Sequence, residues 1–463
     1  MKIRIAKTRI VLLAAVVLLV GLPPVFGMLT EVAVRDRAES LREEGRLLVT
    51  VESFERGWFT SRAVLEIEPA PGGDRRLQTL VGFVRPMTVV VDFKHGPLSV
   101  HDGLFFGLSE LRARPAVAPS GALLDAPFDF DFRAQSTFGG NVNFLAEIRP
   151  FDSAGEGFAL SFLGGRLHGT SSRERLHAAV DTDAVQYTEG TTTWSVFRAH
   201  ASTVTERAAD RAIPNTIKLE IDRMSIDVPE RKRTYELRAL VVESATALDR
   251  AGEHLDGTLH VDLGRLRFAD GTEVAGARLD AAAARLDVAA LAAYSAAARR
   301  AAENGTPFAD EVEPAVLRLL AAAPTVSIDA LRFEVDGEPF DAIVRAKADA
   351  ASLPPAGAAD IRDPAFWASV LGVHAEVAVG KSLAEKAAVA IAKSLLGKDI
   401  GDGASMPNRA VEALAQTQAG IAIALLSAQG LLEDTGNLYR TIVDLEDGRL
   451  SINGQSLPLF DLT

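Results

Sequence analysis

The chain has 463 residues, which is about three average domains of length, and a net charge of −13 from 49 basic and 62 acidic side chains. It contains no cysteine, which excludes disulfides, thiolate metal sites, iron–sulfur clusters and a thiol nucleophile. The acidic balance argues against a nucleic-acid partner, because phosphate binding needs a basic surface.

The N-terminus has the pattern of a membrane anchor. The first nine residues carry four basic side chains and no acid: Lys2, Arg4, Lys7 and Arg9. Residues 10–29 follow without a formal charge, and as a helix they would span about 30 Å, the thickness of the hydrocarbon core. The positive-inside rule places residues 1–9 in the cytoplasm and everything after the span outside it. A cleaved signal peptide is the alternative, although residues 25–27 make a poor cleavage site. The acidic, cysteine-free remainder fits a bacterial periplasmic body on a single-pass inner-membrane protein.

Residues 30–280 have the pattern of antiparallel strands. In residues 63–68 the period of two places Ala63, Leu65 and Ile67 on one face. Phe128, Phe130 and Phe132 share a face in the same way. Further candidate strands are 88–93, 141–148, 216–228, 235–242 and 257–268. They recur too densely for crossover helices, so they favour a meander over βαβ units.

Residues 281–463 mix helices and strands. The predicted helices are 281–302, 312–322, 382–396 and 409–432. Two strands, 325–335 and 340–348, are joined through Asp336-Gly337, which favours a type I′ turn, and a terminal β-hairpin covers 439–453. The apolar part of 409–432 is too short for a bilayer span, so this helix is predicted to pack on 382–396, which ends at Gly397. The expected fold is β-dominated α+β: a broad, mostly antiparallel, meander-like sheet with helices packed on it, after one N-terminal transmembrane helix.

Three motifs occur in a fixed order along the chain. They are Gly57-Trp58-Phe59-Thr60-Ser61, His95-Gly96-Pro97-Leu98, and residues 439–444 followed by Asp447-Gly448 and Asn453-Gly454. This set behind an N-terminal anchor resembles the bacterial YdgA-like family (domain of unknown function 945). The resemblance implies a Gram-negative inner-membrane protein with a periplasmic body, and it brings no established activity and no catalytic residues.

The motif residues suit structural roles, with ligand contact as the alternative. Gly57 supplies a positive φ or a close backbone approach. Trp58 and Phe59 are expected to plug one end of the core, and Ser61 to bond a turn amide. His95-Gly96-Pro97 is expected to end a strand, because Pro97 cannot continue the ladder.

Few residues suggest chemistry. His95/His101 and His254/His260 are each six apart, a spacing that would let each pair share a strand face and bind a cation with Asp102 or Asp262. Exposed or turn histidines are the interpretation that we favour. Asp129 and Asp131 share a strand face as a metal or glycosidase pair might. Amphipathic patterning explains them without chemistry, and a solvated face is the interpretation that we favour. Nucleophile-elbow, P-loop and dinucleotide motifs are missing from the sequence. We therefore expect neither an enzyme nor a cofactor.

Two functions remain open. In the first, the protein binds a hydrophobic ligand such as a lipid, or supports envelope integrity, with Phe128, Phe130 and Phe132 as an apolar ligand face. In the second, it is a scaffold that self-associates or docks onto an envelope complex, and the same phenylalanines are core.

Overall fold

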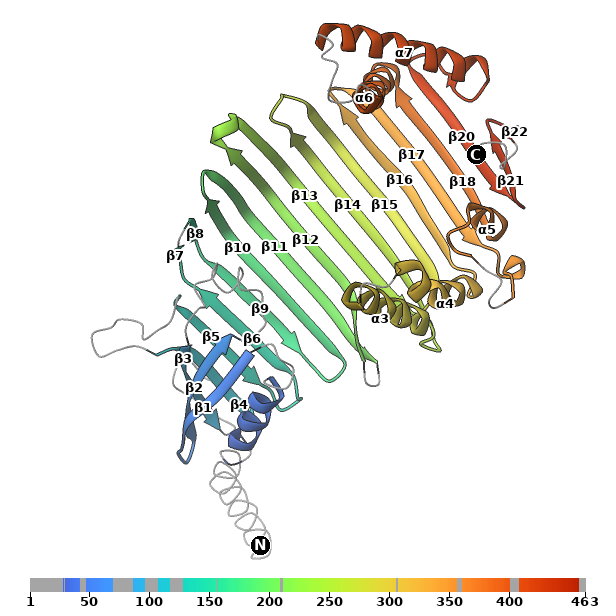
Figure 1. Ribbon diagram of the computed structural model, residues 1–463. Helices are drawn as coiled ribbons and strands as arrows, with labels where there is room; N and C mark the ends of the chain where they lie inside the picture. The colour runs from blue at the N-terminus through green and yellow to red at the C-terminus, as the bar shows by residue number, and fades with distance from the viewer. Residues whose placement is uncertain are drawn as a thin grey trace, which may run out of the picture. The chain divides into compact units, whose positions relative to one another are not determined.

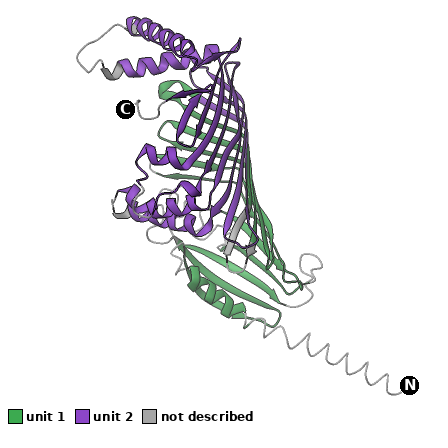
Figure 2. Cartoon of the chain, turned by 90° about the vertical axis from the view of Figure 1, so that its right-hand side faces the viewer, with its two compact units in different colours: residues 1–234 green, residues 235–463 purple. Residues whose placement is uncertain are grey.

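The computed structural model describes residues 28, 30–41, 47–69, 86–95, 107–116, 128–155, 157–208, 211–304, 307–355, 360–399 and 408–457. The basic N-terminus and nearly all of the predicted span, 10–29, therefore lie outside the described residues. The chain divides into two compact units, Met1–Thr234 and Tyr235–Thr463 (Figure 2). Residue 280, the predicted boundary between the β-rich and the α+β regions, lies inside a strand of the second unit.

Unit 1 is built on an antiparallel sheet. Its strands are β1 (Leu47–Arg56), β2 (Thr60–Pro69), β3 (Met87–His95), β4 (Ser109–Pro115), β5 (Phe130–Ser136), β6 (Val142–Ile148), β7 (Phe151–Gly155), β8 (Phe158–Phe162), β9 (Gly165–Ser171), β10 (Arg175–Glu189), β11 (Thr192–Ala208) and β12 (Arg211–Val228). Strands β1 to β6 pair in chain order, β6 pairs with β9, and β9 to β12 again pair in order. The β7–β8 hairpin continues the β6–β9 ladder in the same register beyond Pro150, which has no N–H to donate.

The core of unit 1 lies on one face of β2 and β3. Every second residue of β3 is buried, and Val91 and Phe93 form one cluster with Ala63 of β2. Leu65 and Ile67 pack against this cluster, as does Val34 of the helical residues 30–41. The predicted shared face of Ala63, Leu65 and Ile67 is therefore confirmed.

Unit 2 is an antiparallel meander. Its strands are β13 (Arg233–Leu248), β14 (His254–Arg267), β15 (Glu273–Asp287), β16 (Thr325–Val335), β17 (Glu338–Ala348), β18 (Leu371–Gly380), β19 (Glu433–Asp434), β20 (Leu438–Glu446), β21 (Arg449–Ile452) and β22 (Gln455–Leu457). Each pairs with the next from β13 to β18, and β20 then pairs with β18, β19 and β21. Asp336 and Gly337 both have positive φ, which confirms the predicted turn chemistry.

The helices of unit 2 pack at the ends of the strands rather than across their middle. They are α3 (Val288–Asn304), α4 (Phe308–Ala321), α5 (Pro364–Val370), α6 (Lys381–Asp399) and α7 (Asn408–Ala428). Helices α3 and α4 join β15 to β16 and α5 precedes β18, so they lie at one end of the sheet, whereas α6 and α7 follow β18 and lie at the other (Figure 1). A core cluster of Leu320, Ala348, Phe366 and Val370 forms at the first end.

Four predicted helix limits are wrong. Helix α4 begins at Phe308 rather than at 312. Residues 281–287 belong to β15, which pairs on both sides, and the helix starts after Asp287, whose Oδ1 accepts the Ala290 N–H at 2.7 Å. Ladder pairing overrides the helix propensity of alanine there. Helix α6 passes Gly397 and ends at Asp399, and α7 ends at Ala428 rather than at 432.

Helix α7 packs against α6 as predicted. Among the described helices, Arg409–Ala428 alone is long and apolar enough to cross a membrane, judged by length and composition.

Candidate functional site

The first two motifs meet at the turn between β1 and β2. Ser61 Oγ lies 2.9 Å from His95 Nε2, and both residues are only 4% exposed. The His95 N–H donates to the Phe59 carbonyl at 2.7 Å. Two segments 34 residues apart thus form one hydrogen-bonded unit. Gly96 and Pro97 lie outside the described residues.

The Ser61–His95 pair contains the groups of a nucleophile and its base, but it lacks the rest of a catalytic triad. Burial lowers the pKa of the His95 imidazole, which favours its neutral form. His95 Nδ1 is buried without a hydrogen-bond partner among the described residues, where a triad would place a carboxylate. The ring also stacks on Phe93 at 6.4 Å between centroids. This geometry supports a buried structural contact.

The turn itself explains Gly57 and corrects two predictions. A Cβ at Gly57 would lie 2.6 Å from the Thr60 carbonyl oxygen, to which the Gly57 N–H donates at 2.7 Å, so close approach requires the glycine. Trp58 and Phe59 are 55% and 50% exposed and do not plug the core, because the tight turn directs them outward. Ser61 bonds a histidine rather than a turn amide.

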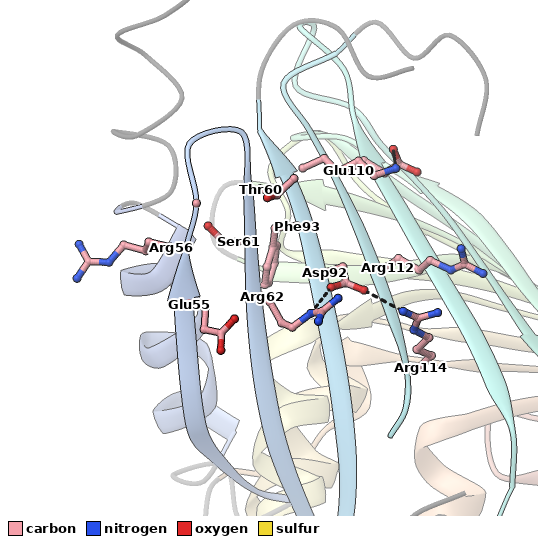
Figure 3. Close-up of a pocket in the computed structure, with 12 residues that line it drawn as sticks. Glu55, Arg56, Thr60, Ser61, Arg62, Asp92, Phe93, Glu110, Arg112 and Arg114 are labelled. Atoms are coloured by element: carbon pink, nitrogen blue, oxygen red, sulfur yellow. Dashed lines mark hydrogen bonds and ion pairs between the residues drawn. The ribbon is translucent and has the colours of Figure 1, made fainter. Parts of the chain in front are cut away.

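A polar pocket of about 540 Å³ opens on the other face of β2, β3 and β4 (Figure 3). It lies opposite the core because Asp92 and Lys94 alternate with the buried residues of β3. Asp92 accepts hydrogen bonds from Arg62 at 2.7 Å and Arg114 at 3.4 Å, and Lys94 lies 3.3 Å from Glu110. The charged lining comprises Arg56, Arg62, Lys94, Arg112, Arg114, Glu55, Asp92 and Glu110. Arg56 and Arg112 pair with Glu31 and Asp131 outside this lining, so the remaining three cations and three carboxylates balance.

The C-terminal motif closes two hairpins. Asp447 and Gly448 have positive φ between β20 and β21, as do Asn453 and Gly454 between β21 and β22. The Asn453 side chain accepts the Ile442 N–H at 2.7 Å and donates to the Gly430 carbonyl at 2.9 Å. These residues hold the last hairpins against the segment that follows α7.

One face of the unit 2 sheet is apolar across seven strands. Directly paired residues of antiparallel strands share a face, so each cross-strand row can be followed through the register. The first row is Val242, Val261, Leu279, Leu331, Ala342, Val377 and Thr441. The second is Ser244, Leu259, Ala281, Ile328, Val344, Ala375 and Val443. The third is Thr246, Gly257, Ala283, Val326, Ala346, Val373 and Leu445. No member of these three rows is charged.

The apolar face of unit 2, defined by these three rows, is largely uncovered. Of its members only Ala342 is buried, Leu259 and Val326 are 37% and 51% exposed, and the others are half-buried. The intervening residues face the other side and carry the charges, as in the His374–Asp444 pair and the Arg332–Asp341 pair. The sheet is amphipathic, and the described helices cover mainly its ends.

A sequence model of the bacterial proteins of unknown function named DUF945 matches residues 5–460. The chain belongs to this family. Neither the curated proteins nor the solved structures include a match to the chain. The function of this DUF945 protein is therefore argued from its geometry.

The predicted phenylalanine face of the DUF945 chain is divided between core and open sheet. Phe130 packs against the core cluster of unit 1, and Phe128 stacks on Phe151 at 5.4 Å between centroids. Phe132 belongs to an apolar cross-strand row that continues through Ala146, Leu167, Val180, Ala201 and Leu219. Within this row Ala146 is buried, whereas Val180 is 44% exposed, so the row is covered at β6 and open at β10.

Asp129 and Asp131 form ion pairs with arginines. Asp131 loses solvation, which raises its pKa, but hydrogen bonds from Arg112 and Arg133 outweigh this and the pKa is lowered. Asp129 lies 2.7 Å from Arg149. The pair forms cross-strand ion bridges and does not converge on a common point.

His254 and His260, the candidate pair that lies within the described residues, do not share a site. His254 Nδ1 lies 3.0 Å from Asp249, whereas His260 lies between Asp280 and Asp262 at 2.5 and 2.6 Å. Across the described ranges, no group of three or more metal-binding side chains is positioned to hold an ion. His101 and Asp102 lie outside those ranges.

Proposed function

We propose that this DUF945 protein is a non-enzymatic, membrane-anchored periplasmic protein that binds a lipid through its acyl chains. The observation that carries the proposal is the uncovered apolar face of unit 2. A sheet with one apolar face normally buries it under a second layer. The acyl chains take the place of that missing layer.

The dimensions of the face suit such a ligand. Seven strands at about 4.8 Å spacing extend about 29 Å across the sheet, and three rows two residues apart extend about 14 Å along it. One acyl chain covers half of a hydrocarbon core about 30 Å thick, which is about 15 Å. The face can therefore accommodate chains lying across the strands. The helices at both strand ends limit it in the other direction (Figure 1).

The chemistry of the face favours a lipid over a folded protein. Its members are Ala, Val, Leu, Ile, Gly, Ser and Thr, without the Trp, Tyr and Arg side chains that dominate protein–protein hot spots. The backbone groups of the inner strands are already used in ladders on both sides. Only non-directional apolar contact remains, and a flexible hydrocarbon chain needs nothing more.

The test uses adjacent residues of β14 that face opposite sides. A photoreactive amino acid replaces either Leu259, on the apolar face, or Thr258, on the polar face, in the full chain, and intact bacteria are irradiated. Mass spectrometry of the purified protein then identifies adducts. We expect lipid adducts at Leu259 and none at Thr258, since both positions are exposed. Equal labelling of both faces, or no lipid adduct at Leu259, would contradict the proposal.

A second candidate function, docking onto an envelope partner, is favoured by a separate surface. Aliphatic side chains of α6 and α7 are exposed: Ile391, Leu395, Ile421 and Leu425. The same photoreactive residue at Ile421 would give a protein adduct of discrete mass if this surface is an interface, and a dimer-sized adduct if the chain self-associates.

A further inference from the structure

Trp58 and Phe59 form an exposed aromatic pair that the core does not explain. They lie at the tip of the β1–β2 turn and keep half or more of their surface in solvent. The turn is rigid, because the Gly57 N–H donates to Thr60 and the Phe59 carbonyl accepts from His95. The aromatic pair is therefore presented on a fixed support.

The aromatic pair lies beside the point where the apolar run of the N-terminus ends. Arg56 directly precedes the turn, and its Nε lies 2.9 Å from Glu31 Oε2. The apolar run ends at residue 29, two residues before Glu31, and two residues span at most about 7 Å. A membrane-crossing 10–29 segment would thus leave the bilayer close to the turn.

We infer that Trp58 and Phe59 dock into the headgroup region of the bilayer beside the anchor. This inference rests on the proposed membrane anchor. Aromatic side chains favour the membrane interface, where an apolar ring and the indole N–H can both be satisfied.

A second copy of the chain fits this surface poorly. A stable interface buries about 800 Å² on each partner. Two aromatic side chains at the tip of a turn offer only a fraction of that area, whereas a bilayer needs only the two side chains to insert.

The full chain has three tryptophans, so its own fluorescence reports on the contact. The full chain is reconstituted into vesicles of phosphatidylethanolamine and phosphatidylglycerol that contain brominated acyl chains. We expect bromolipid-dependent loss of emission in the parent and no such loss in Trp58→Phe. The matched control, Trp194→Phe, removes a tryptophan that stacks on Tyr187 in the sheet and should leave the loss intact. The exposed Trp58 can change without affecting folding, which a melting curve verifies.

An alkaline wash of the vesicles separates the two proposals. If the protein is retained and bromolipid quenching is either unchanged by Trp58→Phe or not seen at all, the docking inference alone is overturned. Protein released by the wash would overturn the anchor and the docking inference together. Retained protein with quenching that depends on Trp58 supports both.

Discussion

Removing the Ser61 hydroxyl measures how much the buried Ser61–His95 contact contributes to the local stability of the β1–β2 turn. In Ser61→Ala, His95 Nε2 loses its partner while Nδ1 already has none among the described residues, so both ring nitrogens are unpaired in a ring that is 4% exposed. A buried polar group left without a partner costs about 1–3 kcal/mol. At 1.4 kcal/mol for each factor of ten, local opening increases about 5- to 140-fold.

Hydrogen exchange in the full chain provides the assay, because it resolves local opening in a chain of two units. The reporter is the His95 amide, which donates to Phe59 across the turn. The matched control is the double variant Ser61→Ala/His95→Phe, which replaces both polar partners by apolar groups of similar shape. Such replacements are close to neutral, so protection should return toward that of the parent.

The same pair predicts a pH dependence. Burial lowers the pKa of His95 in the folded protein, so below the unfolded value of about 6.5 the unfolded chain binds more protons. In the parent, the stability of the turn therefore falls as the pH drops below about 6.5. This pH dependence disappears in the double variant, which lacks the imidazole. Unchanged exchange in Ser61→Ala, or a double variant as labile as the single one, would refute the reasoning.

Two further predictions concern the sheets. Gly169→Ala should destabilise unit 1 by about 1–3 kcal/mol through overpacking, because its Cβ would lie 2.1 Å from a carbonyl oxygen of β10 and 2.5 Å from the Phe144 ring. In Gly257→Ala the nearest atom lies 3.7 Å from the new Cβ, so thermal melting should show little change in stability or a small gain. Similar losses of stability in both variants would contradict the packing described around the two glycines. Hydrogen bonds to Asp280 and, to a smaller extent, to Asp262 raise the pKa of His260. The stability that these bonds to the protonated ring provide is therefore lost as the pH rises through the raised pKa. Asp280→Asn should lower the pKa of His260 in an NMR titration. An unchanged titration would show that the Asp280 contact is not formed.

Alternation along the chain did not by itself decide which strands were predicted. Residues 88–93 lie within β3 although Val90 interrupts the alternation, whereas β10 was not predicted, nor was β18, in which Val373, Ala375 and Val377 alternate with His374 and Glu376. In β10 both faces mix apolar and polar side chains, Val180 with Thr182 on one and Val185 with Asp181 on the other, which blurs the period of two. A sheet that is open on both sides tolerates such residues, so its strands carry a weaker signal.

The site was predicted only as a set of separate motifs. Gly57, Ser61 and His95 were singled out, yet the Ser61–His95 contact depends on the pairing of β2 with β3, which brings together residues 34 positions apart. The exposure of Trp58 was missed because a Trp-Phe dipeptide favours a core position unless a turn directs it outward.

The sequence by itself determined the local features of this protein: the charge-flanked apolar N-terminal run, the turn chemistry at Asp336-Gly337, and the alternation that assigns side chains to opposite faces. These depend on neighbouring residues only, since the φ preferences of turns and the period of a strand are local properties. Only the tertiary structure decided that the apolar faces align across seven strands and that the helices leave them open. Register and helix placement are set by long-range pairing, which no local pattern specifies.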